Sequence, residues 1–256
     1  MSPLTRLPSR PATLALTAAV IGAAQGPAWA APGCTTQSSA SITPVVELYT
    51  SEGCNSCPPA DGWISSLKAE PGVVALAFHV DYWDRLGWKD RFASPAYTQR
   101  QAQQQQSNGA RFSYTPQVVL NGFDRPQWQS QPAPNAVRER APAKVDIVLT
   151  RDGRQLQAQV RALPGAPARL AAYWAVSENG HSTAVKAGEN QGETLKHDFV
   201  VRQYAPVAAW NAAAGEAMAI RFDADLSNAA GTPTEVNLVV IDAVTRRPVQ
   251  AVKLGC

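Results

Sequence analysis

Two cysteines separated by two residues, Cys54 and Cys57, constrain this chain more than any other feature of its sequence. They lie in the stretch VVELYTSEGCNSCPPAD, residues 45–61. The apolar residues at its start predict a strand, and Pro58-Pro59 predict the first turn of a helix. The cysteine pair is therefore expected in a loop that leads from a strand into a helix N-terminus.

The first thirty residues have the pattern of a cleaved export signal. Arg6 and Arg10 precede an apolar run at residues 12–24, and residues 28–30 provide an A-x-A cleavage site. A membrane anchor is the competing interpretation, but the run is shorter than the roughly 20 residues that span a bilayer. We expect removal of residues 1–30, which leaves a periplasmic or secreted protein without a membrane span.

Charge and cysteine content limit the partners of the chain. The formal net charge of +3 falls to +1 without Arg6 and Arg10, with 21 basic against 20 acidic residues, and the basic residues are scattered. This pattern is not typical of nucleic-acid binding. In an oxidising compartment, Cys34 near the cleavage site and Cys256 at the end are expected to form a structural disulfide, and two free thiols are the alternative.

A cysteine pair with this spacing fits three kinds of chemistry. At a helix N-terminus, unpaired N–H groups and the helix dipole stabilise a thiolate, which favours a redox pair with Cys54 as attacking and Cys57 as resolving thiol. One alternative is an inert disulfide that holds the start of the helix. The other is a metal site, although zinc needs further ligands and the remaining cysteines lie at the ends of the mature chain.

Several secondary-structure elements are expected after the cysteine loop. An apolar run at residues 73–80 predicts a strand buried on both faces. Ser94 and the proline that follows predict the start of a helix that continues to about Ser107. Thr115-Pro116 precedes a short apolar strand at residues 118–120, and a proline in this position is compatible with a cis bond.

The hydrophobic pattern changes near residue 143. Residues 127–142 contain three prolines and indicate a linker or a degraded helix, and from there on apolar residues alternate in seven short strands separated by turns. Such a series is typical of an antiparallel sandwich. We expect an α/β domain at residues 31–142 followed by an all-β immunoglobulin-like sandwich domain at residues 143–256.

Longer motifs resemble a known family. VELYTSEGCNSCPPAD, FHVDYWD, GWKDRF and YTPQVVLNG, within residues 45–122, and AGENQGETLKHDFVVR at residues 187–202 are similar to a family of secreted bacterial thioredoxin-like proteins, domain of unknown function 1223. The order of strand, cysteine pair, helix, strand, helix and Thr-Pro strand also resembles the thioredoxin fold. The resemblance implies a thioredoxin-like first domain, whereas the family has no settled activity.

The thioredoxin resemblance also implies roles for individual residues. Pro116 would be a cis-proline beside the cysteine pair, and Thr115-Pro116 would shape the groove where a substrate docks. Glu47 would be a buried acid that moves protons for Cys57, with an exposed glutamate as the alternative. The sequence departs from thioredoxin at Asn55-Ser56, between the cysteines, and in the proline-rich residues 123–141.

His79 ends the second strand, on the edge where α/β folds place their sites. Two thiolates and an imidazole suit a soft metal, so Cys54, Cys57 and His79 form an alternative copper site. In the competing interpretation, His79 packs under the cysteine loop and no metal or other cofactor is bound.

Aromatic and polar residues near these strands are further candidates. Asp81, Trp83 and Trp88 are expected to line a groove, where aromatic side chains often anchor a partner. In the second half of the chain, three polar residues are expected to be structural or to lie at a domain interface: Glu189, Asn190 and His197.

These observations favour a thiol-disulfide oxidoreductase that acts on protein or small-molecule thiols and disulfides. A copper-binding module that uses the cysteine pair and His79 is one alternative. The other is a non-catalytic binding protein in which the Cys54–Cys57 bond is structural.

Overall fold

The computed structural model describes residues 34–226 and 231–255, which belong to one compact unit that begins at Gly33. The expected export signal, residues 1–30, lies outside the described residues. So does Cys256, one partner of the expected bridge to Cys34. Within the described ranges, no helix has the length and hydrophobicity needed to cross a membrane.

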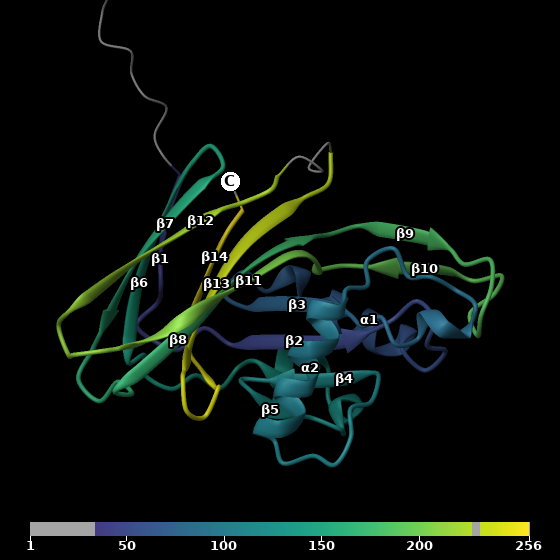
Figure 1. Cartoon of the computed structure of the whole chain (residues 1–256), viewed down its shortest axis with the longest axis horizontal. Coiled ribbons are helices and arrows are strands. Elements are labelled where there is room, and N and C mark those ends of the chain that lie inside the picture. Colours follow the sequence, from purple (N-terminus) through teal and green to yellow (C-terminus); the bar gives the residue numbers. More distant parts are fainter. Residues whose placement is uncertain (1–33, 227–230, 256) are drawn as a thin grey trace, which may run out of the picture. The chain divides into compact units, whose positions relative to one another are not determined.

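An eight-stranded mixed sheet runs through this unit, in the order β14-β13-β8-β11-β3-β2-β4-β5 (Figure 1). β2 (Val45–Thr50) and β3 (Val74–His79) are parallel neighbours, and both are buried along their whole length. This confirms the expectation of a strand buried on both faces. β4 (Gln117–Leu120) pairs antiparallel with β2, and β5 (Phe123–Asp124) forms the edge.

β11 (Val200–Asn211) connects the two parts of this sheet. At its start Val200 pairs in parallel with Ala77 of β3, and the rest of β11 runs antiparallel to β8 (Arg169–Glu178). Two further antiparallel strands complete the sheet beyond β8: β13 (Thr234–Asp242) and β14 (Pro248–Leu254).

The expected fold class, a thioredoxin-like α/β domain followed by an immunoglobulin-like sandwich, is therefore wrong. Strands from both sides of residue 142 share the eight-stranded sheet, and most of the fold is β. The alternation of apolar residues indicates which face of a strand is buried. It does not indicate which other strand forms hydrogen bonds along the edge of that strand. Here β11, more than 120 residues after β3, pairs with that edge.

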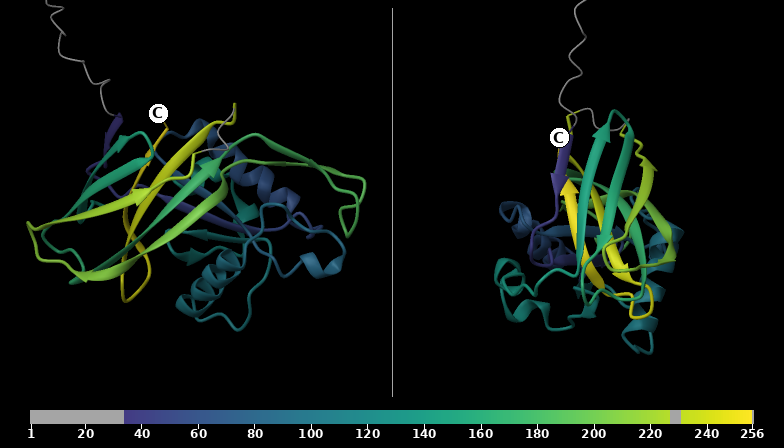
Figure 2. Two further views of the ribbon diagram at one scale, coloured as in Figure 1. Left: turned by 45° about the horizontal axis from the view of Figure 1, so that its top comes forward. Right: turned by 90° about the vertical axis from the view of Figure 1, so that its left-hand side faces the viewer.

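A second, four-stranded antiparallel sheet contains three of the seven strands expected after residue 143, namely β6, β7 and β12, together with β1. Its order is β1-β6-β7-β12, and Figure 2 shows it beside the yellow strands β13 and β14. Trp174, Leu238 and Ile147 belong to the apolar core between the two sheets. The bounds of its strands are β1 (Cys34–Gln37), β6 (Val145–Asp152), β7 (Gln155–Ala162) and β12 (Ala217–Asp223).

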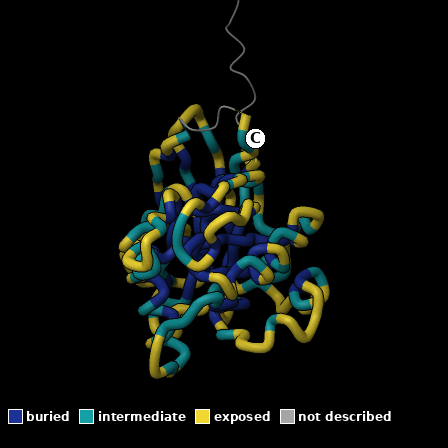
Figure 3. Tube along the Cα trace, turned by 90° about the vertical axis from the view of Figure 1, so that its right-hand side faces the viewer, coloured by how far each residue is buried: buried dark blue, intermediate teal, exposed yellow. Residues whose placement is uncertain are grey.

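Helices cover the two faces of β2 and β3. Val46 and Leu48 pack towards Ile64 of α1, whereas Tyr49 packs on the other face with Tyr97 of α2. Figure 3 shows the buried stretches gathered inside the unit. The helices are α1 (Pro58–Ser65), η1 (Ser66–Ala69), η2 (Asp84–Leu86), α2 (Pro95–Ser107), η3 (Trp128–Ser130) and α3 (Ala133–Ala136).

The helix expected from Ser94 is confirmed. Ser94 is the N-cap of α2, and its side-chain oxygen accepts a hydrogen bond from the backbone N–H of Ala96. Residues 127–142, expected as a linker or a degraded helix, contain only the short η3 and α3.

A buried ion pair links β2 to α2. Arg100 donates to the carboxylate of Glu47, which also accepts hydrogen bonds from Tyr49, Gln104 and Tyr173. Burial raises the pKa of Glu47, but the charge of Arg100 and these hydrogen bonds outweigh it and hold the pKa below its ordinary value. Because Tyr173 belongs to β8, the ion pair also ties the two parts of the large sheet together.

Replacing Arg100 with methionine should destabilise the protein strongly, because the change leaves a buried carboxylate unpaired. We expect the free energy of unfolding at pH 7, measured by urea denaturation, to fall by about 3–5 kcal/mol. The exposed pair of Arg154 and Asp223, 3.2 Å apart, provides the control. Arg154→Met should cost less than about 1 kcal/mol.

The sign of the pH dependence follows from the lowered pKa of Glu47. Its contribution to stability is fully present above the unfolded pKa, about 4.3, and is lost as the pH falls through the folded pKa. In Arg100→Met, burial without the neighbouring positive charge raises the pKa of Glu47, so the carboxylate takes up a proton at higher pH than in the wild type. The difference between wild type and variant should therefore shrink between pH 7 and pH 4. Equal losses for the Arg100 and Arg154 variants at pH 7 would contradict this account.

Candidate functional site

Cys54 and Cys57 form a disulfide immediately before α1, with their Cα atoms 5.4 Å apart. The strand, cysteine loop and helix expected from the sequence are confirmed. Both cysteines are fully buried, whereas Asn55 and Ser56 between them are exposed. The disulfide is thus covered by the protein on all sides, although its loop reaches the surface.

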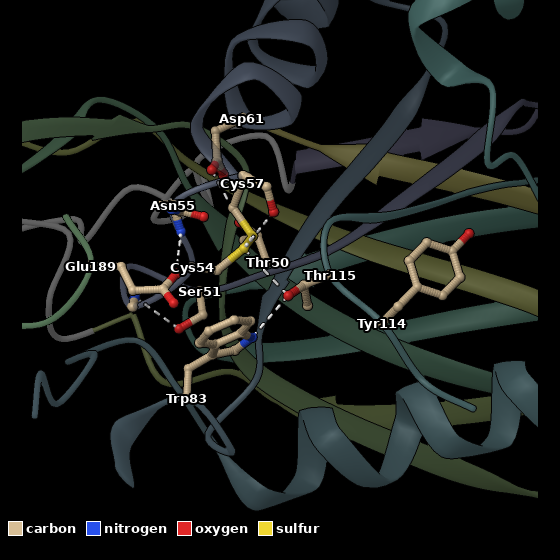
Figure 4. Close-up of a disulfide and its surroundings, with 12 residues drawn as sticks. Thr50, Ser51, Cys54, Asn55, Cys57, Asp61, Trp83, Tyr114, Thr115 and Glu189 are labelled. Atoms are coloured by element: carbon tan, nitrogen blue, oxygen red, sulfur yellow. Dashed lines mark hydrogen bonds between the residues drawn. A yellow bond between two sulfur atoms is a disulfide. The ribbon is translucent and has the colours of Figure 1, made fainter. Parts of the chain in front are cut away.

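The Thr115-Pro116 peptide bond is cis, and its loop lies against the disulfide. The Thr115 hydroxyl donates to Sγ of Cys54 at 3.4 Å and accepts a hydrogen bond from Nε1 of Trp83 at 2.8 Å (Figure 4). A Cβ atom added to Gly53 would lie only 3.1 Å from Cβ of Trp83, so a glycine suits this close approach. The structure therefore brings together Cys54, Trp83 and Thr115, three of the residues that the sequence singles out.

An arm from the second half of the chain covers the cysteine loop. β9 (His181–Ala184) and β10 (Thr194–His197) form this hairpin between β8 and β11, and β10 contacts α1. In the loop of the arm, Nδ2 of Asn190 donates to the backbone oxygens of Glu52 and Cys54 at 2.9 and 3.0 Å. Glu189 accepts from the backbone N–H of Asn55 at 3.1 Å (Figure 4).

Glu189 and Asn190, which the sequence predicts to be structural or to lie at a domain interface, thus belong to the surroundings of the disulfide. The signal that could have found them is the AGENQGETLKHDFVVR motif at residues 187–202, which carries polar residues at high density.

A cluster of buried ionisable side chains lies between the cysteine loop, β3 and β10. Nδ1 of His79 is 2.7 Å from Oδ2 of Asp90. The ring of His197 lies between two carboxylates, with Nδ1 at 3.5 Å from Asp61 and Nε2 at 3.6 Å from Glu52. Burial lowers the pKa of His197, but the two carboxylates raise it to about 9.

Trp88, expected to line a groove, contacts this cluster. Its Nε1 donates to Oε2 of Glu52 at 2.8 Å. Asp81 instead accepts from the hydroxyl of Thr98 in α2. Glu47, expected to move protons for Cys57, has its carboxylate engaged by Arg100 on the α2 side of the sheet.

The copper site of Cys54, Cys57 and His79 stays a prediction. The two sulfurs are bonded to each other here, and His79 has its neighbours in Asp61 and His197 instead. Thiolates become available to a metal only after the disulfide is reduced.

Comparison with known proteins agrees with the sequence motifs. A family model described as "Protein of unknown function (DUF1223)" matches residues 45–241. The crystal structure of a protein from Agrobacterium tumefaciens is similar, with a TM-score of 0.61 and 27% sequence identity over 83% of this chain and 94% of that one. No curated protein matches the chain. The family match extends from β2 into β13 and includes the disulfide, the cis-proline loop and the arm, so the chain belongs to the DUF1223 family of proteins of unknown function.

Proposed function

We propose that this protein is an exported thiol-disulfide oxidoreductase that acts through Cys54 and Cys57. The observation that carries the proposal is the hydrogen bond from the Thr115 hydroxyl, in the cis-proline loop, to Sγ of Cys54 in the loop before α1. After reduction, the same hydroxyl stabilises a Cys54 thiolate through its hydrogen bond, and the positive end of the α1 dipole adds to this effect. The export pattern at residues 1–30 supports an oxidising compartment, where such an enzyme works.

The reaction begins from the disulfide. A substrate thiolate attacks Sγ of Cys54 and forms a mixed disulfide, while the Cys54–Cys57 bond breaks and its electron pair leaves on Cys57 as a thiolate. A second substrate thiolate then attacks the substrate sulfur and releases Cys54. The substrate has lost two electrons to the cysteine pair, and the same steps in reverse reduce a substrate disulfide.

Access to Cys54 requires movement of its cover, because the side chain is fully buried. Asn190 holds the loop of the arm in place through two hydrogen bonds to the backbone of the cysteine loop. Displacement of this loop by the substrate opens a path to the sulfur and leaves the disulfide protected from other thiols.

A non-catalytic protein with a structural disulfide is the second candidate function. The burial of both cysteines favours it, since inert disulfides are inaccessible to thiols. The two candidates differ in whether the Cys54–Cys57 bond exchanges with a substrate.

Replacing Cys54 with serine should abolish exchange with a dithiol peptide and leave only the uncatalysed rate. Cys57→Ser, given a peptide disulfide instead, should accumulate a mixed disulfide, because the Cys54 thiolate attacks the peptide disulfide, one peptide thiolate leaves and no Cys57 thiol resolves the product. Mass spectrometry detects it as the added mass of the attached peptide. The double variant Cys34→Ser/Cys256→Ser removes cysteines elsewhere and should keep the wild-type rate. Equal rates for wild type and Cys54→Ser would end the proposal and favour a structural disulfide.

Replacing Asn190 with alanine should speed reduction of the disulfide by dithiothreitol, because the change removes two hydrogen bonds that hold the cover. With about 1 kcal/mol for each bond, we expect an increase of roughly tenfold or more. Gln191→Ala, at an exposed neighbouring position, is the control and should leave the rate unchanged. If the Asn190 variant is reduced at the wild-type rate, the loop does not control access.

A further inference from the structure

We propose that Asp61, His79 and His197 form a binding site for Zn²⁺ beneath the disulfide loop. Asp61 comes from α1, His79 ends β3, and His197 ends β10. Each offers one ligand atom, and the three atoms all lie within 4.8 Å of one another. All three residues are buried. The site uses neither cysteine, so it does not depend on the redox function proposed above.

His79 has the arrangement of a metal ligand. Oδ2 of Asp90, 2.7 Å away, accepts from Nδ1–H, which leaves the lone pair on Nε2. Asp90 is itself fixed by hydrogen bonds from the backbone N–H groups of Glu52 and Phe92. Among the described residues, Nε2 of His79 has no hydrogen-bond partner although the side chain is fully buried. An unpaired nitrogen in this position is costly unless something binds it.

The positions of His197 and Asp61 also suit them as metal ligands. Nδ1 of His197 is 3.5 Å from Oδ1 of Asp61, close to the roughly 3.3 Å that separates two ligand atoms around a tetrahedral zinc ion. Nε2 of His197 faces Oε1 of Glu52 at 3.6 Å, and Glu52 is held by Trp88. Oδ2 of Asp61 accepts from the hydroxyl of Thr50 at 3.0 Å.

Each imidazole therefore has a carboxylate on the side away from the other ligands, Asp90 behind His79 and Glu52 behind His197. A carboxylate that orients the second nitrogen of a histidine is a common feature of zinc sites. The distances from His197 to both carboxylates are too long for strong hydrogen bonds. Small shifts of these side chains onto a shared cation would satisfy the unpaired nitrogens.

The chemistry of the ligands and their charge favour zinc. Two imidazoles and a carboxylate are a preferred set for Zn²⁺ and leave a fourth position open. Binding replaces the proton that the two carboxylates favour on His197. A divalent cation also compensates the negative charges of Asp61, Glu52 and Asp90, which are buried together. A hollow of about 440 Å³ is lined by Asp61, Lys68 and His197 among others, so it adjoins two of the three ligand residues.

Isothermal titration calorimetry with Zn²⁺ tests the site. The oxidised wild-type protein, freed of metal with a chelator, should bind one Zn²⁺ ion. His79→Ala and His197→Ala should weaken binding by at least about a hundredfold, and Asp90→Asn by about ten- to a hundredfold. His181→Ala removes the remaining histidine of the chain, which contacts Glu178 instead, and should bind as the wild type does.

Two further measurements separate this site from the alternatives. The Cys54→Ser/Cys57→Ser variant should keep the site, and loss of binding in that variant would favour a thiolate site and overturn the proposal. Co²⁺ bound to the wild-type protein should show visible d–d bands without a sulfur-to-cobalt charge-transfer band, a result that does not depend on folding of the histidine variants. Absence of stoichiometric Zn²⁺ binding by the wild type would overturn the proposal outright.

Discussion

The pairing of β11 with the edge of β3 is the constraint on which the rest of this structure depends. It places strands from the second half of the chain in the same sheet as the strand that leads to the cysteine loop. It also directs the hairpin of β9 and β10 across the N-terminus of α1, so that Asn190 reaches the backbone of Cys54. His197, at the end of β10, comes to lie beside His79, with ring centres 4.9 Å apart. Without this pairing, neither the cover of the disulfide nor the buried histidine cluster would form.

The disulfide is held by contacts of two different kinds. The cis-proline loop and Trp83 provide a hydrogen bond to sulfur and close packing, while the charged cluster supports the loop from within the fold. The strand that precedes the loop is fixed on both faces, because alternate side chains of β2 contact α1 and α2. Glu47, on the α2 face, pairs with Arg100 and adds a charged contact to the apolar ones. The cysteine loop is therefore attached to a rigid base, and its cover is held by few hydrogen bonds.

Local features of this fold could be predicted from the sequence, because each depends on neighbouring residues. Ser94 with a following proline identified α2, a continuous apolar run identified β3, and the residues around Cys54 identified the strand, loop and helix. The fold class could not be predicted, because the pairing of Val200 with Ala77 leaves no mark in the hydrophobic pattern of either strand. The same holds for the site. Asn190 contacts Glu52 across 138 residues of sequence, and the cluster around His79 is completed by His197, which lies 118 residues further along the chain.

The reduction potential of the Cys54–Cys57 pair, measured by equilibration with glutathione buffers, tests most directly whether this disulfide takes part in exchange. For an oxidoreductase we expect a value between about −270 and −120 mV, the range of known thiol-disulfide enzymes. A disulfide with a potential in that range can be reduced by a partner thiol with only a small change in free energy. A value below about −300 mV, typical of structural disulfides in secreted proteins, would contradict the proposed function.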